Sequence, residues 1–180
     1  ATAFATDSGI TPTDQTTVTI KKKYTLTNED TISPGETFKL EQDGDGIFTD
    51  GDTTTSAPGL VNITTATFAE GAATKAGATV EITVTLPQYN KVGVYEYTLK
   101  ESDGKMAGVN YYKGDIRLVV TVVNGSDGKL GIAAVAVHTG DKKSDTFENT
   151  YSAGTLNISK TVTGNLGDQS KYFKFKVTLN

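Results

Sequence analysis

The chain of 180 residues contains no cysteine and no tryptophan, and it has a single histidine. Without cysteine it can form no disulfide, so an exported protein of this sequence must obtain its rigidity in another way. A metal site built on thiolates is excluded, and His138 has no second histidine with which to share a metal, so we interpret it as structural. No apolar run approaches the roughly 20 residues that a helix needs to span a bilayer. We therefore expect no metal and no membrane-spanning segment.

Basic residues are also in short supply. The chain has 17 lysines and arginines against 21 aspartates and glutamates, a net charge of -4 and a pI near 5.0. Partners such as nucleic acids and anionic membranes favour basic faces, so this balance argues against both. The sequence also lacks a phosphate-binding loop, a dinucleotide fingerprint and a Ser-His-Asp set. It predicts neither a conventional enzyme nor a cofactor.

What the chain does have is alternation of apolar and polar residues with a period of two. Clear cases are residues 18–26, 80–86, 95–99 and 116–122. This period is typical of strands that are buried on one face, and the many Gly and Pro punctuation points favour short strands. Residues 66–77 are rich in alanine and predict a short helix. The fold class predicted is all-β, an immunoglobulin-like β-sandwich.

The domain organisation follows from composition and from a strand pattern that occurs twice in the sequence. Residues 1–15 are small and polar and are interpreted as an N-terminal tail or added strand. Residues 16–152 form the main domain. The strand pattern that ends in Lys22 recurs after the boundary and there ends in Lys160. Residues 153–180 are therefore expected to be the first hairpin of a second, similar domain that stops short at Asn180.

Three polar residues break the pattern of apolar faces. Successive side chains of a strand point to opposite faces, and by this parity Lys22, Glu101 and Asn149 each share a face with apolar neighbours. An unpaired buried charge costs several kcal/mol, so such groups need partners. Each residue alone could instead sit at a strand end and reach water. Three complementary residues on separate strands favour a meeting inside the domain.

These residue types together suggest a covalent reaction. Desolvation disfavours the charged form of a buried amine and of a buried carboxyl. A neutral Lys22 amine could attack the side-chain carbonyl of Asn149, while a protonated Glu101 polarises that carbonyl and shuttles protons to the leaving ammonia. The product would be a Lys–Asn isopeptide bond, formed once and without a cofactor.

Three stretches of this sequence carry a family resemblance. Residues 20–23 (IKKK), 93–101 (GVYEYTLKE) and 147–149 (FEN) resemble the signatures of Gram-positive major backbone pilins of the streptococcal T-antigen type. These are isopeptide-forming, CnaB-like domains with an inverse immunoglobulin topology. The resemblance covers nearly the whole chain. It implies that 16–152 is a CnaB-like pilin domain and that 153–180 begins a truncated second one.

The resemblance also implies roles for particular residues. Lys22 and Asn149 would be the bonded pair and Glu101 the catalytic acid, while Lys160 would begin a second cross-link. Sortase would join the C-terminus of one subunit to a lysine of the next, and Lys142 best matches that position, with Lys143 as the runner-up. The function implied is the shaft subunit of a covalent, head-to-tail pilus attached to the cell wall outside the cell.

Two alternatives stay open at this stage. An adhesin stalk or minor pilin module that binds host matrix or glycan would share the fold and the bond. Lys142 and Lys143 could also be ordinary solvated charges.

The acidic stretch Asp43–Asp52 contains many carboxylates, which are ligands that calcium favours. It departs from the EF-hand pattern, however, so we interpret it as a solvated loop.

Overall fold

The computed structural model describes residues 11–154, together with residues 161, 174, 176 and 178. Within this part the chain consists of strands and turns, so it offers no helix that could cross a membrane. The strands are β1 (Thr17–Leu26), β2 (Glu36–Phe38), β3 (Leu40–Gln42), β4 (Ile47–Asp50), β5 (Thr53–Ser56), β6 (Asn62–Ile63), β7 (Ala66–Phe68), β8 (Ala78–Thr85), β9 (Gly93–Glu101), β10 (Val109–Asn110), β11 (Ile116–Asn124), β12 (Leu130–Thr139), β13 (Lys142–Lys143) and β14 (Thr146–Tyr151).

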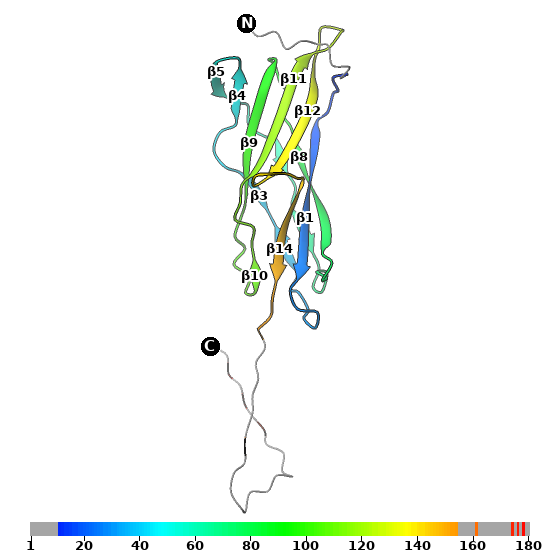
Figure 1. The fold of residues 1–180 in the computed structure, drawn as a ribbon, viewed down its shortest axis with the longest axis vertical. Helices are drawn as coiled ribbons and strands as arrows, with labels where there is room; N and C mark the ends of the chain where they lie inside the picture. Colours follow the sequence, from blue (N-terminus) through cyan, green and yellow to red (C-terminus); the bar gives the residue numbers. More distant parts are fainter. Residues whose placement is uncertain (1–10, 155–160, 162–173, 175, 177, 179–180) are drawn as a thin grey trace, which may run out of the picture.

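Two main sheets face each other along the length of the molecule (Figure 1). The first has the order β10-β14-β1-β8-β6. The second has the order β13-β12-β11-β9-β4-β5, with β3 also paired to β9, and a small third sheet joins β2 to β7. The chain enters the described domain at the end near the β11–β12 turn and leaves it at the opposite end, below β14 (Figure 1). The predicted all-β sandwich is confirmed.

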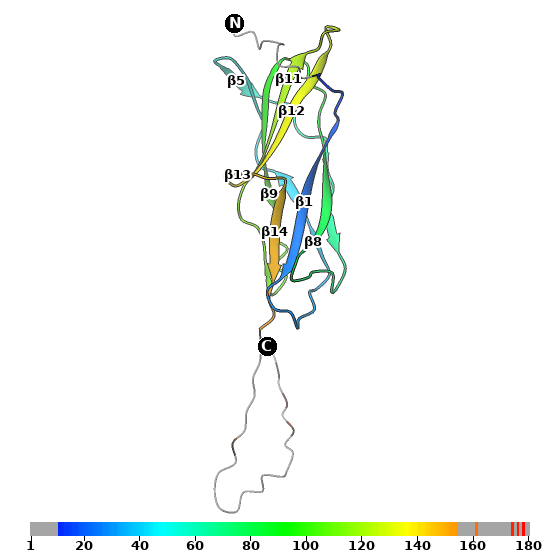
Figure 2. The ribbon, with the colours of Figure 1, turned by 45° about the vertical axis from the view of Figure 1, so that its right-hand side comes forward.

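The first and last long strands of the described domain lie side by side and run in the same direction (Figure 2). In this parallel pair Lys22 is opposite Phe147 and Tyr24 is opposite Asn149. On its other side β1 pairs antiparallel with β8. A pull on the two ends of the domain would therefore shear β1 against β14, and only non-covalent contacts of this strand pair, its hydrogen bonds and surface ion pairs among them, would resist it.

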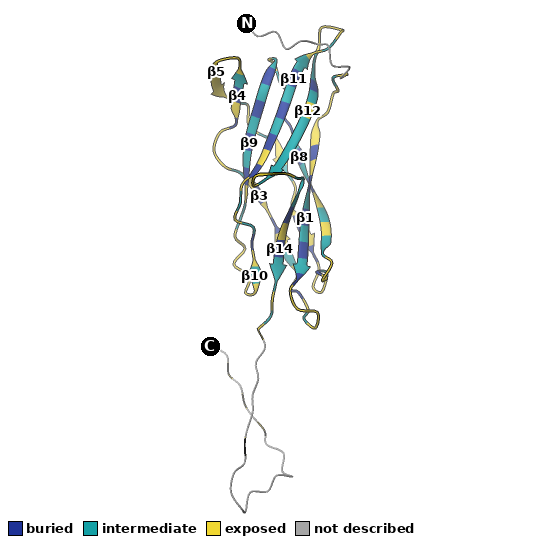
Figure 3. Cartoon of the chain, viewed as in Figure 1, coloured by how far each residue is buried: buried dark blue, intermediate teal, exposed yellow. Residues whose placement is uncertain are grey.

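The core lies between the sheets, where every second side chain is buried. The alternation is visible along β9 and β11, whose buried and half-buried positions follow one another (Figure 3). Tyr24, Phe38 and Phe68 pack edge to face, with ring centroids 5.1 to 5.7 Å apart. This aromatic cluster includes Tyr24 of β1 and borders the buried polar residues described below, because Phe38 also contacts Lys22.

The prediction of a short helix over residues 66–77 was wrong. Ala66 and Phe68 are buried in the core from strand β7, which pairs with β2. Burial of the Phe68 ring outweighs the helix propensity of the alanines that follow it. Gly71 and Gly77 then adopt positive φ angles of 74° and 92°, which end any helical continuation.

Candidate functional site

Strand β1 carries three adjacent lysines that alternate between two faces. Lys22 points into the core and is fully buried, whereas Lys21 and Lys23 are half-exposed on the opposite face. The exposed pair forms surface salt bridges, from Lys21 to Asp145 and from Lys23 to Glu148, each at 3.5 Å. The face predicted for Lys22 is therefore the face that it occupies.

Glu101 and Asn149 reach Lys22 from two other strands. Glu101 is the last residue of β9 in the opposite sheet, and its side chain is fully shielded from solvent. Asn149 lies in the middle of β14 and is also fully buried. Since β1 and β14 are neighbours in one sheet and β9 belongs to the other, the three side chains meet between the sheets.

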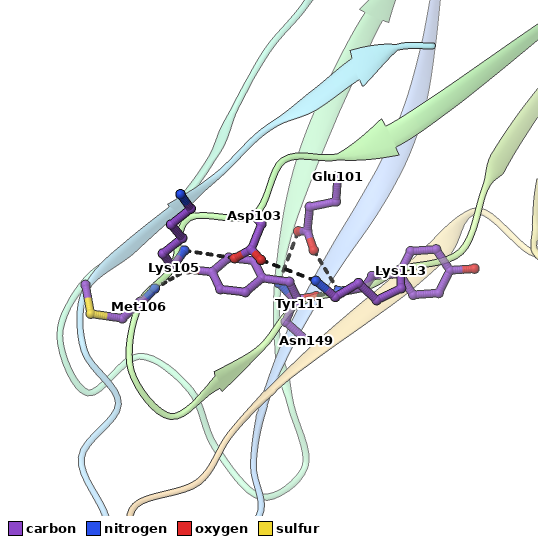
Figure 4. Close-up of polar contacts among 8 residues, drawn as sticks. Glu101, Asp103, Lys105, Met106, Tyr111, Lys113 and Asn149 are labelled. Atoms are coloured by element: carbon purple, nitrogen blue, oxygen red, sulfur yellow. Dashed lines mark hydrogen bonds and ion pairs between the residues drawn. The ribbon is translucent and has the colours of Figure 1, made fainter.

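The contacts among the three side chains converge on one oxygen atom. Lys22 Nζ lies 2.6 Å from Glu101 Oε1, although the angles of this contact are not those of a hydrogen bond. Asn149 Nδ2 donates a hydrogen bond of 3.1 Å to the same Oε1 (Figure 4). A single carboxyl oxygen therefore contacts both the amine and the amide nitrogen.

A backbone group completes the cluster. The N–H of Tyr112 donates to Glu101 Oε2 at 2.9 Å and to Asn149 Oδ1 at 2.8 Å. Because an N–H can only donate, the atom of Asn149 that faces it must be the carbonyl oxygen. This fixes the orientation of the amide, with Oδ1 toward Tyr112 and Nδ2 toward Glu101. Both oxygens of Glu101 accept hydrogen bonds, and Oε1 also lies 2.6 Å from Lys22 Nζ, within reach of proton transfer from the amine.

The walls of the site are aromatic. Lys22 Nζ lies 4.0 Å from the ring centroid of Phe147 and 4.7 Å from that of Phe38. Burial among these rings lowers the pKa of Lys22 from 10.5 to about 8, although the charge of Glu101 acts in the opposite direction. A neutral amine, the form that can act as a nucleophile, is therefore accessible here near neutral pH.

This arrangement has the components of an amide-exchange reaction. It supplies an amine with a lowered pKa, a carboxamide in a fixed orientation, and a carboxyl that contacts both nitrogens. All three side chains are shielded from water, so hydrolysis does not compete. The Tyr112 N–H was missed in the sequence analysis. Every residue except proline has such a group, and only the fold reveals which one is aimed at a site.

The remaining predicted residues lie elsewhere. Lys142 and Lys143 form strand β13, which pairs with the end of β12, and both are exposed. Lys143 is opposite His138, which is half-buried in β12. Lys160 lies outside the described residues.

The acidic stretch is partly a hairpin and not a single solvated loop. Residues 47–50 and 53–56 form the antiparallel strands β4 and β5. Asp43 forms a salt bridge of 2.7 Å with Lys100. Over the described part of the chain, no three acidic or histidine side chains are grouped closely enough to hold a metal ion.

Comparison with known proteins finds two family models and several relatives. The model described as FctA, a Spy0128-like isopeptide containing domain, matches residues 14–152. A domain of unknown function (DUF7601) matches residues 154–180. A pilin from Streptococcus pyogenes serotype M1 is 30% identical over 189 residues, which cover 99% of this chain and 54% of the relative.

Solved structures support the same assignment. The crystal structure of the major pilin from Streptococcus pyogenes matches with a TM-score of 0.66 and 25% identity, over 87% of this chain and 57% of that one. The major pilin T3.2 from serotype GAS13637 of the same species matches in fold, with a TM-score of 0.65 at 20% identity, over 91% and 61%. This chain spans a little over half the length of these relatives. The resemblance drawn from three short motifs is confirmed, and the chain belongs to the Spy0128-like isopeptide containing domain family of pilins.

Proposed function

We propose that this domain is a shaft subunit of a cell-surface pilus and that an amide bond between Lys22 and Asn149 cross-links it internally. The observation that carries the proposal is the shared atom, Glu101 Oε1, which contacts Lys22 Nζ at 2.6 Å and Asn149 Nδ2 at 3.1 Å. A proton shuttle between two nitrogens needs one group within reach of both, and this oxygen meets that condition.

The reaction balances without an added reagent. Lys22 Nζ transfers a proton to Glu101 and attacks Cγ of Asn149. The tetrahedral intermediate collapses when the bond from Cγ to Nδ2 breaks, and Glu101 returns the proton to this nitrogen. Nζ gives up a second proton as the amide forms, so Nδ2 gains two protons in all and leaves as ammonium, and the neutral domain becomes lighter by one ammonia. One carbon–nitrogen bond forms and one breaks, and Glu101 ends as it began.

The position of the bond supports a mechanical role. Lys22 lies in the first strand and Asn149 in the last, and these strands are parallel neighbours. Force applied to the two ends would enter through the start of β1, cross the new bond and leave through the end of β14. The strands between them would carry little load. For this reason the hydrogen bonds of the β1–β14 pair would not have to resist shear.

Intact mass measurement tests the bond. The purified domain should be lighter than its sequence mass by one ammonia. Glu101→Ala and Asn149→Ala should each restore the full mass. Glu148→Ala is the matched control, because this carboxyl is adjacent to Asn149 in sequence but exposed on the outer face, where it pairs with Lys23. Full mass in the folded, unaltered domain would disprove the bond.

The proposed partners are further copies of the same subunit, joined head to tail by sortase outside the cell. Lys142 remains our candidate for the acceptor amine. Lys143 is the alternative, since it lines an open groove of about 550 Å³ together with Val18 of β1 and residues 135–137 of β12. Such a groove could hold an extended C-terminal segment against the edge of β12.

A sortase assay separates the two lysines. Lys142→Arg and Lys143→Arg each preserve charge but remove the reactive primary amine. Incubation with the cognate sortase should give covalent ladders with the Lys143 variant and none with the Lys142 variant. Ladders from the Lys142 variant, and their loss in the Lys143 variant, would assign the linkage to the groove. Ladders from both variants would exclude these two lysines as required acceptors.

A further inference from the structure

Among the described residues, the backbone N–H of Tyr112 is the group that donates a hydrogen bond to the carbonyl oxygen of Asn149. We propose that this N–H is the oxyanion donor of the cross-linking reaction. The inference rests on the proposed function and adds to it a catalytic group that is not a side chain. It also reassigns a step, because polarisation of the carbonyl falls to Tyr112 and not to Glu101.

The chemistry demands a donor at this oxygen. When Lys22 Nζ adds to Cγ, the carbonyl electrons move onto Oδ1, which then bears negative charge until the bond to Nδ2 breaks. An oxyanion donor must lie about 2.7–3.1 Å from the position that this oxygen takes in the intermediate. In the unreacted amide the Tyr112 nitrogen already lies 2.8 Å from Oδ1, on the side where the charge develops. Glu101 is turned toward the other end of the amide, where it contacts Nδ2 at 3.1 Å. The two ends of the carboxamide therefore have two different partners.

The surroundings make this donor effective. Lys22 and Asn149 are fully buried, and the Glu101 side chain is fully shielded. In a site without water, a fixed N–H stabilises developing charge more than it would in solvent, and it needs no reorganisation during the reaction. The same N–H also donates to Glu101 Oε2 at 2.9 Å, so it holds the acid and the amide in contact with each other.

The acid Glu101 and the donor Tyr112 lie at the two ends of one loop, and contacts within the loop hold it in place. Glu101 ends β9, and the chain returns to the site at Tyr112. Asp103 accepts a hydrogen bond of 2.9 Å from the N–H of Lys105, which has a positive φ of 56°, and forms an ion pair of 3.3 Å with Lys113 (Figure 4). These contacts tie the start of the loop to the residue that follows the donor.

A second set of contacts holds the middle of the loop. The hydroxyl of Tyr111 donates to Glu36 Oε1 at 3.0 Å and accepts a bond of 3.2 Å from the N–H of Met106. The loop therefore fixes the spacing between acid and donor through its own contacts and its contact with Glu36. Strand β14 holds the loop as well, because it pairs antiparallel with β10, and it also supplies the amide that reacts.

The test removes one hydrogen atom. The chain can be assembled by chemical ligation at alanine junctions followed by desulfurisation, a route that suits a sequence without cysteine. Assembly in denaturant yields unfolded chains in which Lys22 and Asn149 have not yet formed the cross-link. An α-hydroxy acid in place of Tyr112 converts the amide to an ester and deletes the N–H. The matched control places the ester at Lys113, whose N–H bonds to neither Glu101 nor Asn149 in the described site. Tyr112→Phe tests whether the phenol matters.

Refolding by dilution starts the reaction, and intact mass follows the loss of ammonia with time. We expect the Tyr112 ester to react about 100- to 1,000-fold more slowly than the Lys113 ester, because that is the usual cost of losing one oxyanion donor. Tyr112→Phe should react at the rate of the unaltered chain. Equal rates for the two esters would overturn the inference while leaving the cross-link intact, whereas an unaltered chain that keeps its ammonia would overturn the proposed function itself.

Near-ultraviolet circular dichroism verifies that each chain has folded. Should the Tyr112 ester not fold, an unreactive Lys22→Met chain decides the question by nuclear magnetic resonance. A scalar coupling between the Tyr112 nitrogen and Cγ of Asn149 would support the hydrogen bond. Its absence, in a spectrum that shows such couplings across the β1–β8 pair, would overturn the inference.

Discussion

Three identical residues stand next to one another in β1, and the molecule uses them in two ways. Lys21 and Lys23 lie at the surface, where each faces a carboxylate at 3.5 Å across the β1–β14 pair. Lys22 lies between them in sequence but on the buried face, where it contacts Glu101 at 2.6 Å and two aromatic rings. All three have an acidic partner, so the partner alone does not make an amine reactive.

Desolvation is what separates the buried lysine from its neighbours. A surface ion pair shares its charge with water and with salt, and it contributes little. Around Lys22 the rings of Phe38 and Phe147 replace water, and the pKa of the amine falls to about 8. The following predictions, taken from the largest expected effect to the smallest, test whether this contrast holds.

The largest effect is expected from loss of the bond itself. Asn149→Ala prevents the cross-link, which would otherwise close a loop of more than 100 residues. By analogy with a disulfide of that span, the free energy of unfolding should fall by about 5 kcal/mol. Chemical denaturation followed by circular dichroism measures this difference, with the surface variant Lys23→Ala as the control. A fall of similar size in both variants would refute the contrast.

The rate of bond formation should depend on pH in a particular direction. The reaction needs one proton shared between Lys22 and Glu101, present as an ammonium with a carboxylate or as an amine with a carboxylic acid. Above the Lys22 pKa of about 8 this shared proton is lost, and Glu101 can no longer supply acid to the leaving nitrogen. Refolding at a series of pH values should show the rate falling about tenfold for each unit above that value.

The opposite trend would identify a different mechanism. If a neutral amine alone were sufficient, the rate would rise as pH passes through about 8 and then level off. Loss of ammonia, measured by intact mass at each pH, distinguishes the two profiles. Circular dichroism at the same pH values serves as the control for folding.

The sequence predicted a good part of this site, for a physical reason. Strand parity is a strict rule, so the sequence alone predicts that Lys22, Glu101 and Asn149 lie on buried faces. Parity could not show that the three faces converge, since that depends on the parallel pairing of β1 with β14 and on the sheet opposite. The role of the Tyr112 N–H could not be predicted from the sequence, because the position of this group depends on how a loop closes. Helix propensity misled at residues 66–77, where core packing of Phe68 prevailed.

A smaller effect on the free energy of unfolding is expected from a substitution of Tyr24, which shares the buried face of β1 with Lys22. Its ring packs against Phe38 and Phe68, but its buried hydroxyl has no hydrogen-bond partner within the described part of the chain. Tyr24→Phe removes the unpaired hydroxyl and keeps the ring. We expect the free energy of unfolding to stay the same or to rise by about 1 kcal/mol. A clear loss of stability would show that the hydroxyl has a partner, such as a buried water.

The smallest effect is expected at Lys21, the exposed counterpart of Lys22. Its ion pair with Asp145 joins two side chains that are each nearly half-exposed, 45% and 46%. Lys21→Ala should change the free energy of unfolding by less than about 0.5 kcal/mol, and high salt should shrink even that difference. The variant should still lose one ammonia in full. A Lys21→Ala domain that kept its full sequence mass would mean that the outer lysines help to form the bond. The face of the strand on which a lysine lies would then not by itself separate a structural charge from a reactive one.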